Sequence, residues 1–275
     1  MKVKGIEAVK YAFFDVDGTL MNEEYQIPIE LLTNVSRLKK VGILPIICTG
    51  REFLSMKKIW EEYLLSDYFY HKVITNDGNC IYDTKTDTFS IMEIIDLSKI
   101  KLILKEYESV CRWVITSPQK ILYSNKYALM EYKMLFMYSG KSEICTEFDK
   151  IAENINKEEL LGFYMFISEQ DADNRKFESY GLKKMNYSRG YSYTSNQTKL
   201  DGARYLLKKD FEEEFFLHSM AFGNGKNDYL LFKETSYSVA VQNAHPKLIE
   251  IATECLHEQS LSQYVRKIFN SLEMK

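Results

Sequence analysis

The sequence lacks the cysteine and histidine spacings that mark disulfide-rich domains and structural zinc sites. Its five cysteines are odd in number and include no CxxC pair, and its four histidines include no HxxxH or HxH pair. Disulfide frameworks use even numbers of cysteines, and structural zinc sites use closely spaced cysteine or histidine pairs. The sequence therefore argues against both as the basis of the fold.

Long apolar runs and an excess of positive charge are also missing. No stretch approaches the roughly 20 apolar residues that a membrane-spanning helix needs, and the chain begins without an apolar signal segment. The formal net charge is −3, so no basic field exists to attract nucleic acid. We therefore expect no membrane and no nucleic-acid partner, with the cytoplasm as the default compartment.

The chain does have the composition of a globular protein with a sizeable core. It contains 275 residues, of which 45% are hydrophobic and 27% are charged. This length suits one large domain or two unequal ones. No internal repeat or low-complexity segment interrupts it.

The first 80 residues alternate between strand-like and helix-like segments. Apolar runs that end in polar residues are typical of buried strands, and apolar residues at helical spacing are typical of helices. This β-α-β-α-β order predicts a parallel sheet with helices on its faces. The predicted elements are strand 8–14, helix 29–42, strand 43–48, helix 53–64 and strand 72–75.

The pattern changes near Asp83 and returns near Lys199. The intervening segment reads as a hairpin at 80–92, a helix at 97–110 and a mixture that includes the apolar run 162–168. After Lys199 the order is again helix, strand, loop, helix and strand. The predicted organisation is a core of residues 1–83 and 196–275 with an inserted α+β domain of residues 84–195.

Polar residues follow four of the predicted strands. In open α/β sheets the carboxyl ends of parallel strands form the edge at which ligands bind. These residues could therefore converge on one crevice, and Lys199 could reach it from the start of its helix. The four segments are Asp15-Val16-Asp17-Gly18-Thr19, Thr49-Gly50-Arg51, Asn76-Asp77-Gly78 and the loop from Gly223 to Asp228.

Two carboxylates that share one strand end repel each other unless a cation or a proton joins them. Mg²⁺ prefers oxygen ligands, commonly one or two carboxylates with substrate phosphate and water. Asp15 could bind the ion with one oxygen and attack phosphorus with the other, while Asp17 serves as general acid and base. Lys199, the Thr49 hydroxyl and backbone N–H groups could hold the charge of the phosphoryl group.

Four motifs in this order resemble the haloacid dehalogenase-like (HAD) superfamily. They are FFDVDGTL, CTGR, the lone Lys199 and GNGKND. The insertion further resembles the type IIB cap of Cof-type sugar-phosphate phosphatases, and the likeness covers nearly the whole chain. It implies a Rossmann-like parallel sheet with helices on both faces, an α+β cap, Mg²⁺ as cofactor and a small-molecule phosphate ester as substrate.

The resemblance also implies roles for individual residues. Asp15 would be the nucleophile and a metal ligand, and Asp17 would be the acid/base and bind metal through its carbonyl oxygen. The phosphoryl group would be held by Thr49 and Lys199. Asn227 and Asp228 would complete the loop around the metal and the lysine, and the metal would contact Asn224 and Asp228. Apart from the resemblance, Gly50, Asn76 and Asn227 are candidate substrate-binding residues.

Asn224 departs from the family, which usually has an aspartate metal ligand at this position. An asparagine still offers a carbonyl oxygen, but the site loses one negative charge. We therefore predict weaker Mg²⁺ binding, with Asp228 as a possible source of the missing ligand.

Each of these residues also has a simpler interpretation. Asp15 and Asp17 could cap a helix in a solvated turn, Asn76 could be only a turn residue, and Lys199 could be solvated. Arg51 fits an outer helper or a structural ion pair better than a catalytic group. Cys48 fits a buried, inert thiol.

The aromatic stretch from Tyr123 to Tyr138 could form a ring-stacking pocket, although ordinary core packing explains it better. The function that these patterns favour is a Mg²⁺-dependent phosphatase that works through an aspartyl-phosphate. A phosphomannomutase-like enzyme is the first alternative, with cap arginines to hold a second phosphate. A weakly active or non-catalytic phosphate-binding protein is the second, motivated by Asn224. The candidate cap arginines are Arg112, Arg175 and Arg189.

Overall fold

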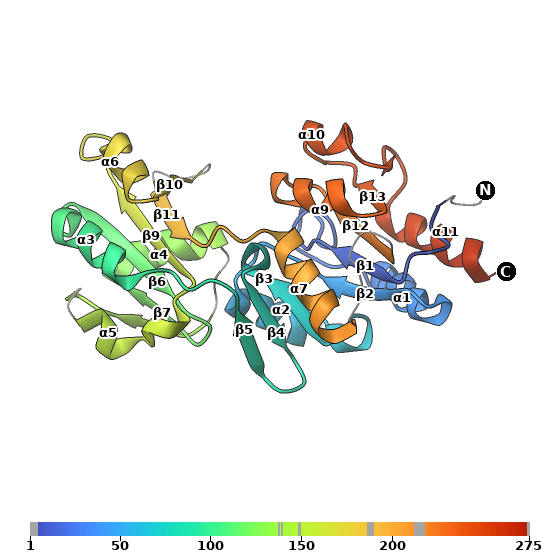
Figure 1. Ribbon diagram of the computed structural model, residues 1–275, viewed down its shortest axis with the longest axis horizontal. Helices are drawn as coiled ribbons and strands as arrows, with labels where there is room; N and C mark the ends of the chain where they lie inside the picture. The colour runs from blue at the N-terminus through green and yellow to red at the C-terminus, as the bar shows by residue number, and fades with distance from the viewer. Residues whose placement is uncertain are drawn as a thin grey trace. The chain divides into compact units, whose positions relative to one another are not determined.

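The computed structural model describes residues 5–136, 138, 140–147, 150–185, 190–211 and 218–273. It divides into two compact units (Figure 1). The core unit comprises Met1–Arg51, Ile59–Ser90 and Gln197–Lys275, and the insertion unit comprises Glu52–Lys58 and Ile91–Asn196. The sequence placed the start of the insertion at residue 84, whereas the core unit continues to Ser90, and it did not assign Glu52–Lys58 to the insertion.

The core unit is built on a parallel sheet of five strands in the order β14-β13-β12-β1-β2. Each neighbouring pair is parallel, as the alternation of strands and helices predicted. The strands are β1 (Tyr11–Phe14), β2 (Leu44–Ile47), β12 (Ser219–Gly223), β13 (Tyr237–Ala240) and β14 (Glu254–Cys255).

Helices cover both faces of this sheet, which explains why β1 is buried along its whole length. Successive side chains of a strand point to opposite faces. Phe13 packs in a cluster with residues of α7, α9 and α10, whereas Phe14 stacks on Phe222, whose ring contacts Tyr264 of α11. The helices are α1 (Ile29–Leu38), α7 (Lys199–Phe211), α9 (Tyr229–Glu234), α10 (Pro246–Ile249) and α11 (Leu261–Glu273). Helix α2 (Phe53–Glu62) is divided between the two units at Lys58.

The third predicted strand, β3 (Lys72–Thr75), meets the parallel sheet through a single parallel bridge between Cys48 and Ile74. Its regular partner is β4 (Cys80–Asp83), with which it pairs antiparallel. β4 neighbours β5 (Thr88–Ile91), so the predicted hairpin forms part of a three-stranded sheet. The end of β3 still lies beside the end of β2, because Thr49 N donates to Ile74 O.

The insertion unit contains a six-stranded sheet in the order β10-β11-β9-β6-β7-β8. All neighbours are antiparallel except β7 and β8, so this unit has the predicted α+β character. Its strands are β6 (Cys111–Thr116), β7 (Ile121–Tyr123), β8 (Ser142–Ile144), β9 (Gly162–Ile167), β10 (Lys183–Lys184) and β11 (Gly190–Thr194). Its helices are α3 (Leu97–Tyr107), α4 (Lys126–Phe136), α5 (Ile151–Asn154) and α6 (Asn174–Ser179).

The two faces of this sheet carry separate hydrophobic clusters. Phe163 and Met165 of β9 pack on one side with residues of α3, α5 and α6. Tyr164 of the same strand packs on the other side with Tyr132 of α4 and with Tyr138. The tyrosine rings are in edge contact with one another, so the aromatic stretch that ends at Tyr138 supplies core packing.

In the part of the chain that the structure describes, no helix combines the length and apolarity required to cross a membrane.

Candidate active site

The site lies where polar residues follow the strands of the core unit. Asp15 follows β1 and Asn224 follows β12, and these two strands are parallel neighbours. Thr49 lies just past β2 on the other side of β1, and its N–H donates to Ile74 O of β3. The sequence-predicted segments therefore meet at one edge of the sheet.

Lys199 joins two carboxylates at this edge. Its Nζ lies 2.7 Å from Asp15 Oδ1 and 2.6 Å from Asp228 Oδ1. The side chains of Lys199 and Asp228 are fully buried, and that of Asp15 is 7% exposed. Buried charges require such pairing because their desolvation is costly. The surface interpretation of Lys199 is thus wrong, and the lysine lies within the carboxylate cluster.

Burial and charge pairing have opposite effects on the pKa of each group in this cluster. Burial raises the pKa of Asp15 to about 7, although the charge of Lys199 opposes the rise. Burial alone would lower the pKa of Lys199, but Asp15 and Asp228 outweigh it and raise that pKa above its ordinary value. Lys199 is therefore a fixed positive charge beside Asp15.

Close backbone packing sets the start of α7 and so the position of Lys199. A Cβ atom on Gly78 would lie only 1.9 Å from Thr198 O, and Gly78 has a φ of +94°. Thr198 Oγ1 donates to Asp201 Oδ2 at 2.6 Å, which closes the first turn of the helix. Cys48 lies below the same turn and donates to Lys199 O at 3.7 Å; burial raises the pKa of its thiol well above the ordinary value, so the expectation of an inert thiol is met.

Asp17 is paired with Arg51. Arg51 Nε donates to Asp17 Oδ2 at 2.8 Å, and a second guanidinium nitrogen contacts Asp17 Oδ1. The Asp17 side chain is 50% exposed, whereas that of Arg51 is 7% exposed. The buried arginine is thus ion-paired with a half-exposed carboxylate, as the ion-pair interpretation of Arg51 predicted.

Gly50 opens a small space between two loops. A Cβ atom there would lie 2.8 Å from Asp77 Oδ1 and 3.0 Å from Asn227 Nδ2. These two side chains are hydrogen-bonded to each other at 2.8 Å. Thr49 is fully buried beside them, and its hydroxyl accepts from Arg51 N at 3.1 Å. Thr49, Gly50 and Asn227 are therefore brought together.

Asn76 lies at the end of β3, with a left-handed φ of +52°. Its N–H donates to Arg51 O at 2.8 Å, so it belongs to the same loop cluster. Its side-chain oxygen is buried and has no hydrogen-bond partner among the described residues. A turn role accounts for the backbone, and the contact of the Asn76 side chain with substrate stays a prediction.

Asn224 approaches the turn that carries Asp17. Its Nδ2 would lie 2.3 Å from a Cβ atom on Gly18, whose φ is +71°, so only glycine fits there. The other oxygen of Asp228 accepts from the N–H groups of Asn224 and Gly225, at 3.1 and 2.9 Å. Asp228 therefore clamps its own loop as well as Lys199.

The oxygen-bearing side chains around Asp15 are of the kind that bind a hard divalent cation. Asp15, the half-exposed Asp17 and the amide of Asn224 offer oxygen donors, which Mg²⁺ prefers. The described residues contain no cluster of three or more acidic, cysteine or histidine side chains placed for a metal. Asp15, Asp17 and Asn224 together supply two carboxylates and one neutral amide donor.

Two further residues lie at this edge of the sheet, Asp77 and Asn243, and neither had a predicted role. Asp77 pairs with Asn227, and Asn243 Nδ2 would lie 3.1 Å from a Cβ atom on Gly18. Each follows a strand of the core unit, so position after a strand was the available signal. Of the three cap arginines, Arg112 is paired with Glu131 at 3.1 Å, Arg175 is on α6, and Arg189 lies outside the described residues.

The chain is similar to known hydrolases over most of its length. The family described as haloacid dehalogenase-like hydrolase matches residues 12–260. A curated relative is YcsE of Bacillus subtilis (strain 168), a 5-amino-6-(5-phospho-D-ribitylamino)uracil phosphatase. It is 24% identical over 253 residues, a match that covers 89% of this chain and 88% of the relative.

Solved structures share the fold. TM0651 from Thermotoga maritima superposes with a TM-score of 0.77 at 19% identity, covering 94% of this chain and 97% of that one. BT4131, described as a HAD subclass IIB sugar phosphatase, gives a TM-score of 0.70 at 18% identity over 97% and 98% of the two chains. Their agreement covers both the parallel core and the insertion. The chain belongs to the haloacid dehalogenase-like hydrolases.

Proposed function

We propose that the chain hydrolyses a small phosphorylated metabolite, a sugar phosphate or similar monoester, through an aspartyl-phosphate formed on Asp15. The buried contact of Lys199 with Asp15 carries this proposal. It fixes one oxygen of a carboxylate at the ligand-binding edge of the sheet and leaves the other oxygen for attack. It also places a permanent cation where the charge of a phosphoryl group must be balanced.

In the proposed first step, Asp15 Oδ2 attacks phosphorus and the ester P–O bond breaks. Lys199 and the buried Thr49 hydroxyl hold the phosphoryl oxygens. Asp17 enters this step protonated and released from Arg51, and it gives its proton to the departing ester oxygen. Its half-exposed position suits a group that has to meet a leaving group.

In the second step, Asp17 takes a proton from a water molecule that attacks the phosphorus of the aspartyl-phosphate. The Asp15–phosphorus bond breaks, inorganic phosphate leaves, and both aspartates return to their initial states. The fixed contact with Lys199 keeps Asp15 oriented through both steps.

We further propose Mg²⁺ as the cofactor, held by Asp15, the Asp17 carbonyl oxygen and Asn224. When bound, the ion would neutralise charge on the phosphoryl group. Asp228 as an additional ligand stays a prediction. Its two oxygens already accept hydrogen bonds from Lys199 and from the loop N–H groups, so it would have to give one of them up to bind the metal. Those bonds support a role in positioning Lys199.

The substrate class is proposed from the relatives. YcsE is named for a phosphorylated ribityl compound and BT4131 for sugar phosphates; both are phosphate esters of small polyhydroxy molecules. We expect a panel of phosphorylated sugars and sugar alcohols, tested with Mg²⁺, to contain the preferred substrate. The competing mutase would require a bisphosphate for turnover, so the same panel is run with and without a sugar bisphosphate.

The decisive experiment compares the native protein with Asp15→Asn in p-nitrophenyl phosphate hydrolysis, with and without EDTA. Asparagine keeps the size of the side chain but removes the nucleophilic charge, so we expect activity to fall by at least about a thousandfold. Beryllium fluoride, a mimic of the phosphorylated aspartate, should bind the native protein and not the variant.

Asp67→Asn is the matched control, because Asp67 is an exposed aspartate of the core unit. Its activity should equal that of the native protein. Substantial turnover by Asp15→Asn, together with the absence of a beryllium fluoride adduct in the native protein, would overturn the proposed mechanism.

A further inference from the structure

One pocket of the core unit adjoins the turn that carries Asp17. Its volume is about 600 Å³, within the range of sites for small organic molecules. Gly18 and Thr19 line it, but Asp15, Asp17 and Lys199 do not. It is therefore adjacent to the proposed active site and chemically distinct from it.

The floor of this pocket is apolar. Leu20, Leu31 and Leu256 line it and are themselves almost fully buried. These leucines expose almost no surface to water, so an aliphatic chain lying on them would gain dispersion contacts.

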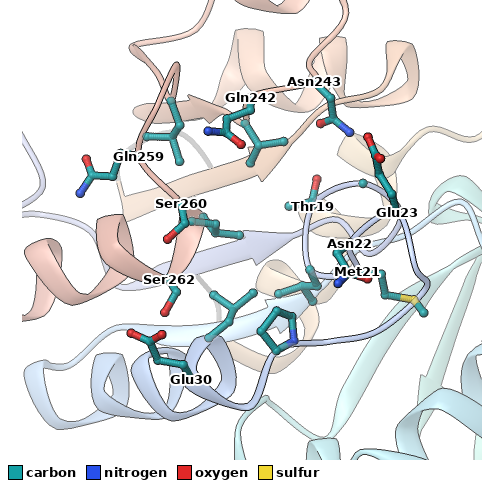
Figure 2. A pocket seen from close by; sticks show the side chains of 17 residues that line it. Thr19, Met21, Asn22, Glu23, Glu30, Gln242, Asn243, Gln259, Ser260 and Ser262 are labelled. Atoms are coloured by element: carbon teal, nitrogen blue, oxygen red, sulfur yellow. The ribbon is translucent and has the colours of Figure 1, made fainter.

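The walls are polar, and none of the 17 lining residues is a lysine, arginine or histidine. Amide side chains supply part of the wall, including Gln242, Asn243 and Gln259 (Figure 2). Thr19 also lines the pocket, and its hydroxyl has no hydrogen-bond partner in the described parts of the chain.

The charged lining residues are two carboxylates, Glu23 and Glu30. Figure 2 shows them on opposite sides of the pocket, Glu23 on the loop after β1 and Glu30 on α1. Neither has a basic partner at ion-pair distance among the described residues. The pocket therefore presents uncompensated negative charge at two ends of an apolar floor, which repels anions and attracts cations.

We propose that this pocket binds a linear aliphatic diamine or polyamine, with an ammonium group at each glutamate and the methylene chain on the leucine floor. A phosphorylated molecule is disfavoured here, because the lining offers no cation to receive a phosphate group. The site would thus bind a ligand of opposite charge to the proposed substrate. The inference does not depend on the proposed function.

The test uses three six-carbon probes of matched length and different charge: hexane-1,6-diamine, hexane-1,6-diol and adipate. Calorimetric titration of the full chain should give saturable binding of the diamine, at least about fivefold tighter than the diol, and no binding of adipate. The diamine affinity should fall at high salt, because exposed charges are screened.

Glu23→Gln and Glu30→Gln should each weaken diamine binding about fivefold, the effect expected for one exposed ion pair. Both residues are exposed, so these substitutions leave the core intact. Glu62→Gln, an exposed glutamate of the same unit, should have no effect. Asp15→Asn should retain diamine binding, which separates this pocket from the proposed active site.

Equal affinity for the diamine and the diol would overturn the proposal, as would diamine binding that survives the combined Glu23→Gln and Glu30→Gln substitutions. Absence of saturable diamine binding would also overturn it. Failure of Asp15→Asn to bind the diamine would show that the probe occupies the active site instead.

Discussion

Lys199 is the residue that compensates the buried charges of the site. Its ammonium contacts Asp15 and Asp228, and both it and Asp228 are inaccessible to solvent. Replacing it with methionine leaves two carboxylates buried without a cation. Breaking a buried ion pair in this way typically costs about 3–5 kcal/mol.

We therefore expect Lys199→Met to lower the free energy of unfolding by about 3 kcal/mol and to abolish measurable phosphatase activity. Adding Asp228→Asn should restore part of the lost stability, because one of the unpaired carboxylates disappears, without restoring activity. Urea unfolding measures the loss of stability in Lys199→Met and its partial recovery in the double variant. Lys208→Met, an exposed lysine of the same helix, serves as control; a double variant no more stable than Lys199→Met would contradict the argument.

Asn224 sets the expected strength of metal binding. Its amide lies against Gly18 in the turn that carries Asp17, and an aspartate of nearly the same size could occupy this place. Asn224→Asp would add a negative charge to the proposed metal site. We expect the Mg²⁺ concentration for half-maximal activity to fall, by about tenfold for each 1.4 kcal/mol gained. An unchanged or higher requirement in a Mg²⁺ titration would refute the prediction.

Position after a strand predicted which residues meet at the site edge, and this prediction is confirmed for Asp15, Thr49, Asn76 and Asn224. The pairs between loops were not predictable in the same way. Asp77 and Asn227 are 150 residues apart, and their contact depends on the strand order of the folded sheet. The catalytic and metal-binding roles of these residues stay predictions that the variants above test.

At the scale of elements, strongly patterned segments were predicted and short ones were not. The apolar runs that became β1, β2, β9 and β12 are buried on both faces and so read clearly in the sequence. β14 has only two residues, Glu254–Cys255, and carries no periodic pattern. β3 was predicted as a strand, but its antiparallel pairing with β4 could not be read from its own four residues.

The junction of β3, β4 and α7 depends on Gly78. Its φ of +94° disfavours any side chain, and an added Cβ would collide with Thr198 O at 1.9 Å. Gly42 is a matched control: its φ is +81°, but nothing lies within 4 Å of its added Cβ. The two glycines thus separate the cost of backbone conformation from the cost of a clash.

We expect Gly42→Ala to destabilise the protein by about 1 kcal/mol, the cost of a left-handed backbone. Gly78→Ala should cost about 3 kcal/mol, because the clash adds to that term, and it should also lower kcat by displacing Lys199. Thermal unfolding and steady-state kinetics check the two effects. Equal destabilisation by the two alanines would contradict the argument, because it would show that the start of α7 moves away from the added Cβ without loss of stability.

At the scale of the whole molecule, the two compact units are interleaved in sequence. Glu52–Lys58 belongs to the insertion unit, although the residues on either side of it belong to the core unit. The sequence predicted one continuous insertion because helix 53–64 follows the second strand of a regular β-α-β pattern. The assignment of Phe53–Lys58 to the insertion unit depends on side-chain packing, which the spacing of apolar residues does not reveal.

Glu52 is the buried acid of that segment. Its side chain accepts a hydrogen bond from Tyr164 Oη at 3.3 Å within the insertion unit, and the residue is 7% exposed. Burial raises the pKa of Glu52 to about 7, although the hydroxyls of Tyr132 and Tyr164 oppose the rise. The folded insertion unit therefore favours the protonated form of this carboxyl.

A raised pKa of an acid means that folding binds a proton more tightly. The stabilisation is complete below the ordinary pKa of 4.5 and is lost as the pH rises through about 7. Glu52→Gln mimics the neutral acid at every pH. Relative to the native protein it should gain about 3 kcal/mol in free energy of unfolding between pH 4.5 and pH 8. Trp113 fluorescence in a Trp60→Phe background would follow the insertion unit, where Trp113 is buried. Glu62→Gln controls for loss of an exposed charge, and a stability difference independent of pH would contradict the argument, because a carboxylate that stays ionised at pH 5 cannot be the group that burial penalises.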